Sequence, residues 1–133
     1  MKQTLFQEKY PVFEAEIAKD ETDHRTVEEI AAYFQEKIAG SEKAKFIGLF
    51  DHYAHTQAIG GEVGPGITAA LNVIFCFGHL LPTPHVLAVR PRSIGIADTG
   101  DVFVVSFLEA PSAPANDTME SWVRGLRRVP VTV

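Results

Sequence analysis

Residues 13–17 alternate between apolar side chains and the carboxylates of Glu14 and Glu16. A period of two is the pattern of a β-strand that has one face buried and the other in water. The alternation therefore predicts a strand over residues 13–17. The more polar residues 1–9 are predicted to form a loosely held lead-in to it.

The pattern changes to helical spacing after a charged turn. Thr26 and Glu29 have the spacing of a capping box, in which two side chains satisfy free backbone N–H groups at a helix start. Gly40 supplies a helix stop. The apolar stripe between them consists of Val27, Ile30, Ala31, Phe34 and Ile38. We expect a helix at about residues 27–39, lying on a sheet.

Apolar segments later in the chain predict four more strands. They are residues 46–50, residues 73–77, a strand within residues 85–97 that Pro91 starts or interrupts, and residues 102–108. The turn residues 98–101 join the last two strands as a hairpin.

The connection over residues 56–70 is long and glycine-rich, with a short helical piece expected near residues 67–71. A last helix follows Pro111 and Pro114, and Asn116 or Asp117 is its predicted cap. Its apolar stripe consists of Met119, Trp122, Val123 and Leu126.

The predicted order of elements is β-α-β-β-β-β-α over 133 residues. Runs of strands that do not alternate strictly with helices favour an α+β fold with a single, mainly antiparallel sheet. The two amphipathic helices are expected on one face of that sheet. No repeat or composition shift marks a boundary, so residues 1–133 are predicted to be a single domain.

The predicted strands at 73–77 and 102–108 carry apolar side chains on both faces. Ile74 and Cys76, for example, point away from the phenylalanines beside them. Each apolar side chain left in water forgoes about 1.5–3 kcal/mol. A second subunit, a ligand or the 56–70 connection must cover the second face, and a homodimer is our first expectation.

Charge and composition exclude several classes of protein. Twelve Lys and Arg residues against 17 Asp and Glu give a net charge of −5, which disfavours nucleic-acid binding. One cysteine excludes a disulfide framework within the chain. The sequence lacks the apolar stretch of a signal peptide and the ~18–20 apolar residues of a membrane helix. We expect a cytoplasmic protein with no membrane partner.

The order of short motifs between Thr26 and Phe107 resembles, as a distant branch, the bacterial family called domain of unknown function 302. The matching positions are Val27-Glu28-Glu29, Asp51-His52, Phe77-Gly78, Thr83-Pro84, Pro91 to Ile96 and Val102 to Phe107. The resemblance implies a small α+β fold with one sheet and two helices, often as a homodimer. It implies no biochemical role.

The densest polar cluster comprises Asp51, His52 and His55, where a strand meets a loop. His52 with Asp51 could form an acid–base pair, and His52 with His55 could share a metal. Cys76 and His79 are weaker metal candidates, which would join the cluster if their strands are neighbours. In the structural alternative, Asp51 caps a turn, His52 packs on the sheet and Cys76 belongs to the core.

Arg90 and Arg92 flank a proline and could hold a carboxylate or phosphate in a forked geometry. The simpler interpretation is two solvated arginines on an edge strand. The glycines of the 56–70 connection lack the Lys-Ser/Thr of a phosphate-binding P-loop. Arg124, Arg127 and Arg128 are expected at the C-terminal end of the last helix, where positive charge complements the helix dipole.

Two functional hypotheses stay open. In the first, the chain is a non-enzymatic homodimer that binds a small molecule or a partner near Asp51, His52 and the 56–70 connection. In the second, it is an enzyme that uses His52 as a general base or holds a His/Cys-bound metal. No motif in the sequence specifies a reaction, a ligand or a cofactor.

Overall fold

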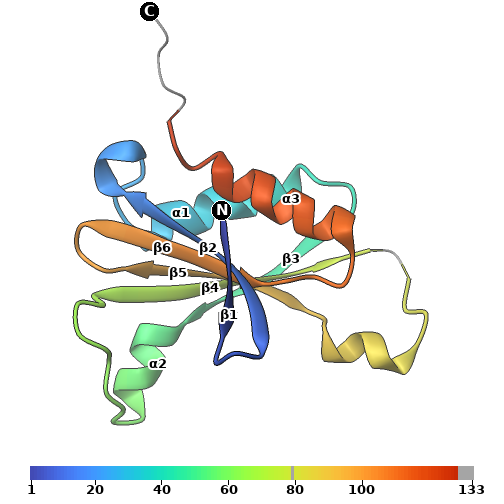
Figure 1. Ribbon diagram of the computed structural model, residues 1–133, viewed down its shortest axis with the longest axis horizontal. Coiled ribbons are helices and arrows are strands. Elements are labelled where there is room, and N and C mark those ends of the chain that lie inside the picture. The colour runs from blue at the N-terminus through green and yellow to red at the C-terminus, as the bar shows by residue number, and fades with distance from the viewer. Residues whose placement is uncertain (79, 129–133) are drawn as a thin grey trace, which may run out of the picture.

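Six strands form one antiparallel sheet in the order β1-β2-β6-β5-β4-β3 (Figure 1). The computed structural model describes residues 1–78 and 80–128. The strands are β1 (Lys2–Phe6), β2 (Tyr10–Ala18), β3 (Ala44–Asp51), β4 (Ala69–Phe77), β5 (Arg92–Asp98) and β6 (Val102–Leu108). The helices are α1 (Val27–Ala39), α2 (His52–Ala58) and α3 (Ala113–Arg124), with short 3-10 helices η1 (Lys19–Glu21) and η2 (Pro84–Ala88). The predicted α+β class with a single antiparallel sheet is confirmed.

The order of elements differs from the prediction at the N-terminus. Residues 2–6, expected to be a lead-in, form β1 and pair with β2. Gln7 and Glu8 make the connecting turn in the left-handed region, with φ of 53° and 62°. Every side chain of β1 is exposed or half-buried, so its sequence carries little of the alternation that reveals a strand.

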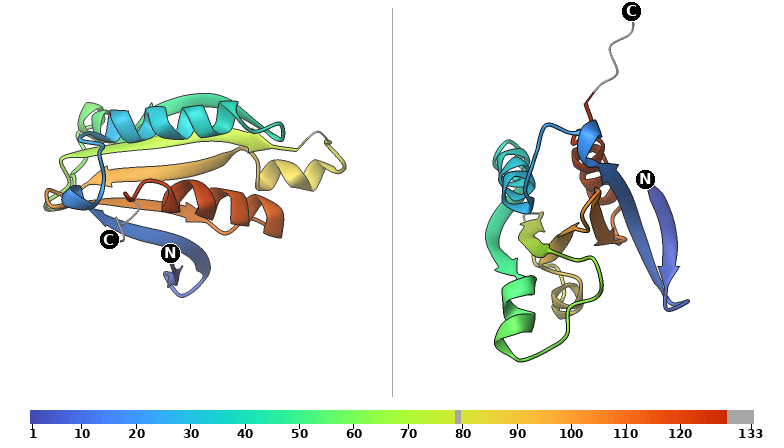
Figure 2. Two further views of the ribbon diagram at one scale, coloured as in Figure 1. Left: turned by 90° about the horizontal axis from the view of Figure 1, so that it is seen from above. Right: turned by 90° about the vertical axis from the view of Figure 1, so that its left-hand side faces the viewer.

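α1 and α3 lie together on one face of the sheet (Figure 2). Thr26 caps α1 as predicted, its hydroxyl accepting a hydrogen bond from the Glu29 N–H at 3.1 Å. The hydroxyl of Tyr33 donates to the carbonyl of Trp122 at 2.6 Å and so joins the two helices. The predicted apolar stripes of both helices are buried against the strand side chains Ala15, Ile17, Leu71, Val73, Phe75, Ile94, Ile96, Phe103, Val105 and Phe107.

The helices differ from the predictions in two places. A third helix, α2, occupies residues 52–58, whereas residues 69–71, where a helical piece was expected, belong to β4. α3 begins earlier than expected because Ser112 is its cap and Pro114 lies in its first turn. A proline is tolerated there since a first-turn N–H has no partner within the helix. Asn116, one of the predicted caps, instead accepts a hydrogen bond from the Ala110 N–H at 2.9 Å.

The second face of the sheet, called the open face below, carries no long helix within residues 1–78 and 80–128. Strand register places Ile74 and Val104 on it, both half-buried, together with Asn72, Ser93 and Ser106. The predicted apolar character of both faces is thus only partly correct, because hydroxyl and amide side chains interleave with the aliphatic ones. Figure 1 shows α2 and η2 below the two ends of the sheet, on the side opposite α1 and α3.

The outermost strand, β3, contains an irregularity. Its pairing with β4 shifts register between Phe46 and Gly48, which leaves Ile47 outside the regular ladder. Ile47 is 57% exposed. Such an extra residue bends and twists the strand locally.

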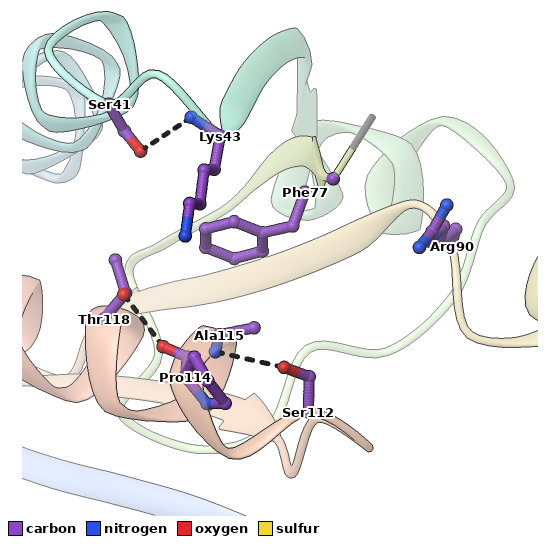
Figure 3. A pocket seen from close by; sticks show the side chains of 9 residues that line it. Ser41, Lys43, Phe77, Arg90, Ser112, Pro114, Ala115 and Thr118 are labelled. Carbon is purple, nitrogen blue, oxygen red and sulfur yellow. Dashed lines mark hydrogen bonds between the residues drawn. The ribbon is translucent and has the colours of Figure 1, made fainter. Parts of the chain in front are cut away.

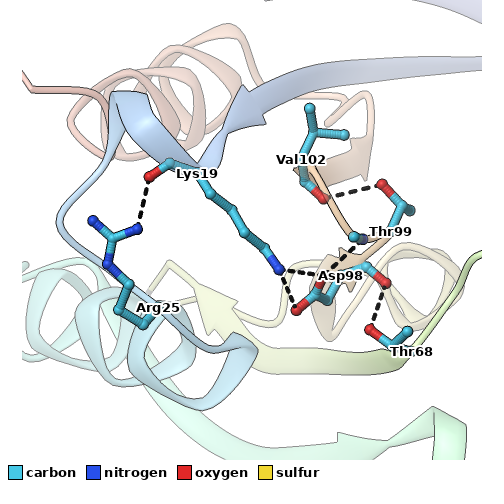
Figure 4. A network of polar contacts seen from close by, with 7 residues as sticks. Lys19, Arg25, Thr68, Asp98, Thr99 and Val102 are labelled. Carbon is cyan, nitrogen blue, oxygen red and sulfur yellow. Dashed lines mark hydrogen bonds and ion pairs between the residues drawn. The ribbon is translucent and has the colours of Figure 1, made fainter.

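An ion pair fastens the end of β2 to the β5–β6 turn (Figure 4). The Lys19 ammonium lies 2.9 and 3.1 Å from the two carboxylate oxygens of Asp98. Burial by itself raises the pKa of the Asp98 carboxyl, but the Gly100 N–H and the Lys19 ammonium together lower it below its ordinary value. The carboxylate is therefore better stabilised in the folded chain than in the unfolded one.

Candidate functional site

The polar cluster predicted at residues 51–55 lies where β3 runs into α2. The Asp51 carboxylate accepts a hydrogen bond from the Ala54 N–H at 2.9 Å and caps α2. In the described residues no hydrogen bond joins Asp51 to His52. The carboxylate thus has the capping role of the structural alternative, and it does not orient the imidazole in this arrangement.

His52 and His55 are exposed, on consecutive turns of α2, with ring centroids 5.9 Å apart. Nδ1 of His52 lies 3.3 Å from the hydroxyl oxygen of Thr56. The ring of Phe50 packs against both imidazoles, at 5.4 Å from His52 and 5.2 Å from His55. The two histidines therefore form part of a small aromatic group at the end of the sheet.

A shallow cavity of about 180 Å³ lies beside this group, between α2 and the 59–68 connection. His52, Thr56 and Glu62 contribute polar atoms to its wall, and Ala70 at the start of β4 closes one side. Ala70 pairs with Ala97 on the open face of the sheet, so the cavity adjoins that face.

Cys76 does not converge with His52 and His55. Within residues 1–78 and 80–128, no three or more His, Cys, Asp or Glu side chains form a group that could hold a metal ion. β3 and β4 are neighbours, as the hypothesis required, but antiparallel pairing places Asp51 opposite Leu71 and Cys76 opposite Lys45. That separates Cys76 from the His52 end by roughly 16 Å, at about 3.3 Å per strand residue. His79 lies outside the described residues.

A larger cavity, of about 340 Å³, lies at the opposite end of β4 (Figure 3). It is enclosed by the α1–β3 connection, the end of β4 and the first turn of α3. Lys43 and Arg90 flank it from two sides, with the Phe77 ring between them. Ser112, Ala115 and Thr118 of α3 complete the wall. We call it the Lys43–Arg90 cavity.

A second cavity, of about 150 Å³, shares Phe77, Arg90, Ser112 and Ala115 with the first, and Arg92 lines it. The structure thus brings both predicted anion-binding arginines to one region. Arg90 Nη1 donates to the Leu80 carbonyl at 2.6 Å.

Arg92 is not the solvated edge residue of the simpler interpretation. It is only 7% exposed, because β5 is an interior strand of the sheet. Its guanidinium donates to the carbonyls of Leu108 and Val89. Its Nε is buried without a hydrogen-bond partner among the described atoms.

Sequence reasoning did not identify Lys43 or the start of α3 as parts of this site. They are separated along the chain by β3, β4 and the hairpin, and no local motif connects them. The only available signal was the unexplained pair Arg90 and Arg92.

A family model described as Family of unknown function (DUF6858) matches residues 1–128. No curated protein and no solved structure matches the chain. In the part of the chain that the structure describes, every helix is too short or too polar to cross a bilayer.

Proposed function

Since the chain belongs to DUF6858, a family of unknown function, we propose a function from its own geometry: it is a homodimeric binding module, in which two copies pair through their open faces. A small-molecule or partner site then lies near Asp51 and His52, at the margin of the interface. The predicted relationship to domain of unknown function 302, in which homodimers are common, and the cytoplasmic location form part of the same proposal.

The observation that carries the proposal is the composition of the open face. Ile74, Val102 and Val104 lie half-buried on it, along the middle strands. Phe50 and Leu108, on the same face by register, are 36% and 45% exposed. An antiparallel sheet tolerates one solvated face, but that face then usually alternates to polar residues. Aliphatic and aromatic side chains spread across several strands favour a covering partner.

Charge supports a second copy as that partner. Glu14 and Glu16 lie on the open face of β2, where Lys2 of β1 pairs opposite Glu14 and leaves one net negative charge. Lys45 lies on the open face of β3, at the other side of the sheet. Two copies can face each other across a two-fold axis that lies between the sheets and is parallel to the strands. The strand order of one copy is then reversed relative to that of the copy it faces. The acidic side of each copy then lies toward the lysine side of the other, which is the self-complementarity that a closed dimer requires.

The shallow cavity beside His52 adjoins the open face through Ala70, so a second copy would deepen it. An isolated cavity of about 180 Å³ is small for a ligand site, since such sites usually measure roughly 300–1,000 Å³. His52 and His55 would supply hydrogen-bonding groups from α2.

The enzyme alternative has weaker support. A general base needs an oriented imidazole, and the Asp51 carboxylate is occupied by the Ala54 N–H instead. His52 and Cys76, two of the candidate metal ligands, also lie at opposite ends of the β3–β4 pair.

The test changes one residue on the open face. Ile74→Lys places a charge in the centre of the proposed interface, and we expect sedimentation velocity to show a monomer where the wild type is a dimer at micromolar concentration. Ala32→Lys, at an exposed position of α1 on the helix side, is the matched control and should remain dimeric. A monomeric wild type would contradict the proposal.

Native mass spectrometry of the purified wild type tests the proposed small-molecule site near Asp51 and His52. It reports the stoichiometry and any small molecule that the chain carries. A carried molecule that disappears in the His52→Ala variant would support the site at α2, and one that persists there would contradict it.

A further inference from the structure

We propose that the Lys43–Arg90 cavity binds a small organic anion, in which a carboxylate or phosphate group is attached to a flat apolar body. The site lies on the helix side of the sheet and does not depend on the proposed dimer. Three features of the region favour such a ligand: its positive charge, the buried Arg92 and the shape of the cavity.

Positive charge gathers around these two cavities. Lys43, Arg90 and Arg92 line the two adjoining cavities, and neither lining includes a carboxylate. Among the described residues these three cations take part in no ion pair. Only four of the 12 basic side chains form an ion pair among the described residues, so what distinguishes these three is that they gather around one region. An acidic chain that leaves three neighbouring cations unpaired has room for an anion from outside.

The buried Arg92 is the second, independent sign. More than nine-tenths of its surface is buried, and Nε has no acceptor. Burial lowers the pKa of the Arg92 guanidinium from its ordinary value, because the charged form loses its hydration. Two backbone carbonyls compensate only part of that loss. A bound anion in the adjoining cavity would offset the remaining cost of the buried charge.

The first turn of α3 contributes to the same potential. Aligned peptide dipoles place partial positive charge at a helix N-terminus, and Ser112 at this terminus lines both cavities. Thr118 also lines the larger cavity, but its hydroxyl donates to the Pro114 carbonyl at 2.9 Å, so the Ser112 hydroxyl is the side-chain donor that this end of α3 offers. These groups complement the two flexible cations across the cavity.

The remaining walls are apolar and aromatic. The ring of Phe77 lies between Lys43 and Arg90, and Pro114 and Ala115 face it from α3 (Figure 3). Phe77 is backed by Trp122, with stacked rings 5.7 Å apart. A volume of about 340 Å³ lies within the usual range for small-molecule sites. A ligand whose flat ring lies beside Phe77 and whose acidic group points toward Lys43 or Arg90 would contact both the apolar and the charged walls of the cavity.

Trp122 is the only tryptophan of the chain and stacks on a wall residue, so its fluorescence reports on the cavity. The full-length protein is titrated with phenyl phosphate, benzoate, inorganic phosphate and the neutral benzyl alcohol, and calorimetry provides a second readout. We expect saturable binding of phenyl phosphate or benzoate, and much weaker binding of benzyl alcohol and inorganic phosphate. The tighter of the two organic anions identifies the acidic group.

Arg90→Gln and Lys43→Gln should each weaken that binding about tenfold or more, as expected for the loss of a charge-assisted hydrogen bond. Lys9→Gln is the matched control. It removes the same charge from an exposed lysine in the β1–β2 turn, which lines neither cavity, and should leave the affinity unchanged.

Three outcomes would overturn the proposal. They are no saturable binding of either organic anion at millimolar concentration, equal binding of benzyl alcohol, and an equal loss of affinity in Lys9→Gln. Ile74 lies on the other face of the sheet. Anion binding by a monomeric Ile74→Lys variant would therefore show that the Lys43–Arg90 cavity binds anions independently of dimerisation.

Discussion

At the scale of single residues, Gly125 is the glycine at which an added methyl group meets the closest neighbouring atom. A methyl group there would collide with the hydroxyl of Tyr33, which bonds to the Trp122 carbonyl. The backbone of Gly125 is helical, with φ of −68°, so alanine introduces no backbone strain. We expect Gly125→Ala to lower the free energy of unfolding by about 1–3 kcal/mol, measured by urea denaturation.

Gly48→Ala is the control for this substitution. A methyl group at Gly48 meets nothing within 4 Å. The change in stability should therefore stay within about 0.5 kcal/mol. A stabilising Gly125→Ala, the usual result at an unobstructed helical glycine, would show that the contact with Tyr33 is not restrictive.

The residue roles that could be predicted are those that depend on neighbours close in the sequence. Thr26 caps the helix that follows it, and Asp51 caps α2 as the structural alternative stated. Arg92 could not be placed in the same way. Its burial depends on β5 lying inside the sheet, and Pro91 beside it suggested an edge strand.

At the scale of elements, the Lys19–Asp98 ion pair predicts a pH dependence. The folded state lowers the pKa of Asp98 below its ordinary 3.8, so its contribution to stability is complete well above pH 3.8. This contribution to stability is lost as the pH falls from 3.8 through the lowered pKa of the folded state, because the Asp98 carboxyl is then protonated in both the folded and the unfolded chain. We expect Asp98→Asn to cost about 1 kcal/mol at pH 7, and this difference from the wild type to vanish in acid.

Denaturation of both proteins between pH 7 and pH 2 measures the effect. Asp101→Asn, at an exposed position of the same turn, controls for the removal of one acidic residue. The interpretation would be wrong if the wild type and Asp98→Asn differed by the same amount at every pH.

The elements that could be predicted have strong periodicity. α1, β4, β6 and the hairpin turn at residues 98–101 appear where apolar spacing or turn residues placed them. β1 and α2 bury no residues, so no apolar pattern could reveal them. The start of α3 was misplaced because Pro114 looked like a boundary, although it occupies the first turn.

At the scale of the whole molecule, pairing of two copies predicts that thermal stability depends on concentration. Folded dimers in equilibrium with unfolded monomers are favoured by mass action. The midpoint of thermal unfolding of the wild type should rise as the protein concentration rises. The midpoint of Ile74→Lys should stay constant over the same range in differential scanning calorimetry, and parallel behaviour of the two proteins would contradict the pairing.

The fold class could be predicted for the whole chain, whereas the location of the larger cavity could not. Lys43, Arg90 and Ser112 meet only after β3 pairs with β4 and α3 folds back over the sheet. A contact between segments so far apart leaves no spacing in the sequence. The cluster at residues 51–55 was visible because its members are neighbours in the chain.

The register shift at Ile47 matters when the chain is concentrated. An outermost strand with free backbone groups is a template onto which further molecules add and grow into fibres. β3 is such a strand, and Ile47 and Leu49 on it are exposed. Such growth needs an uninterrupted hydrogen-bonding repeat, which the shift breaks, and Lys45 adds charge beside it. We therefore expect the β3 edge of the sheet to resist amyloid-like polymerisation.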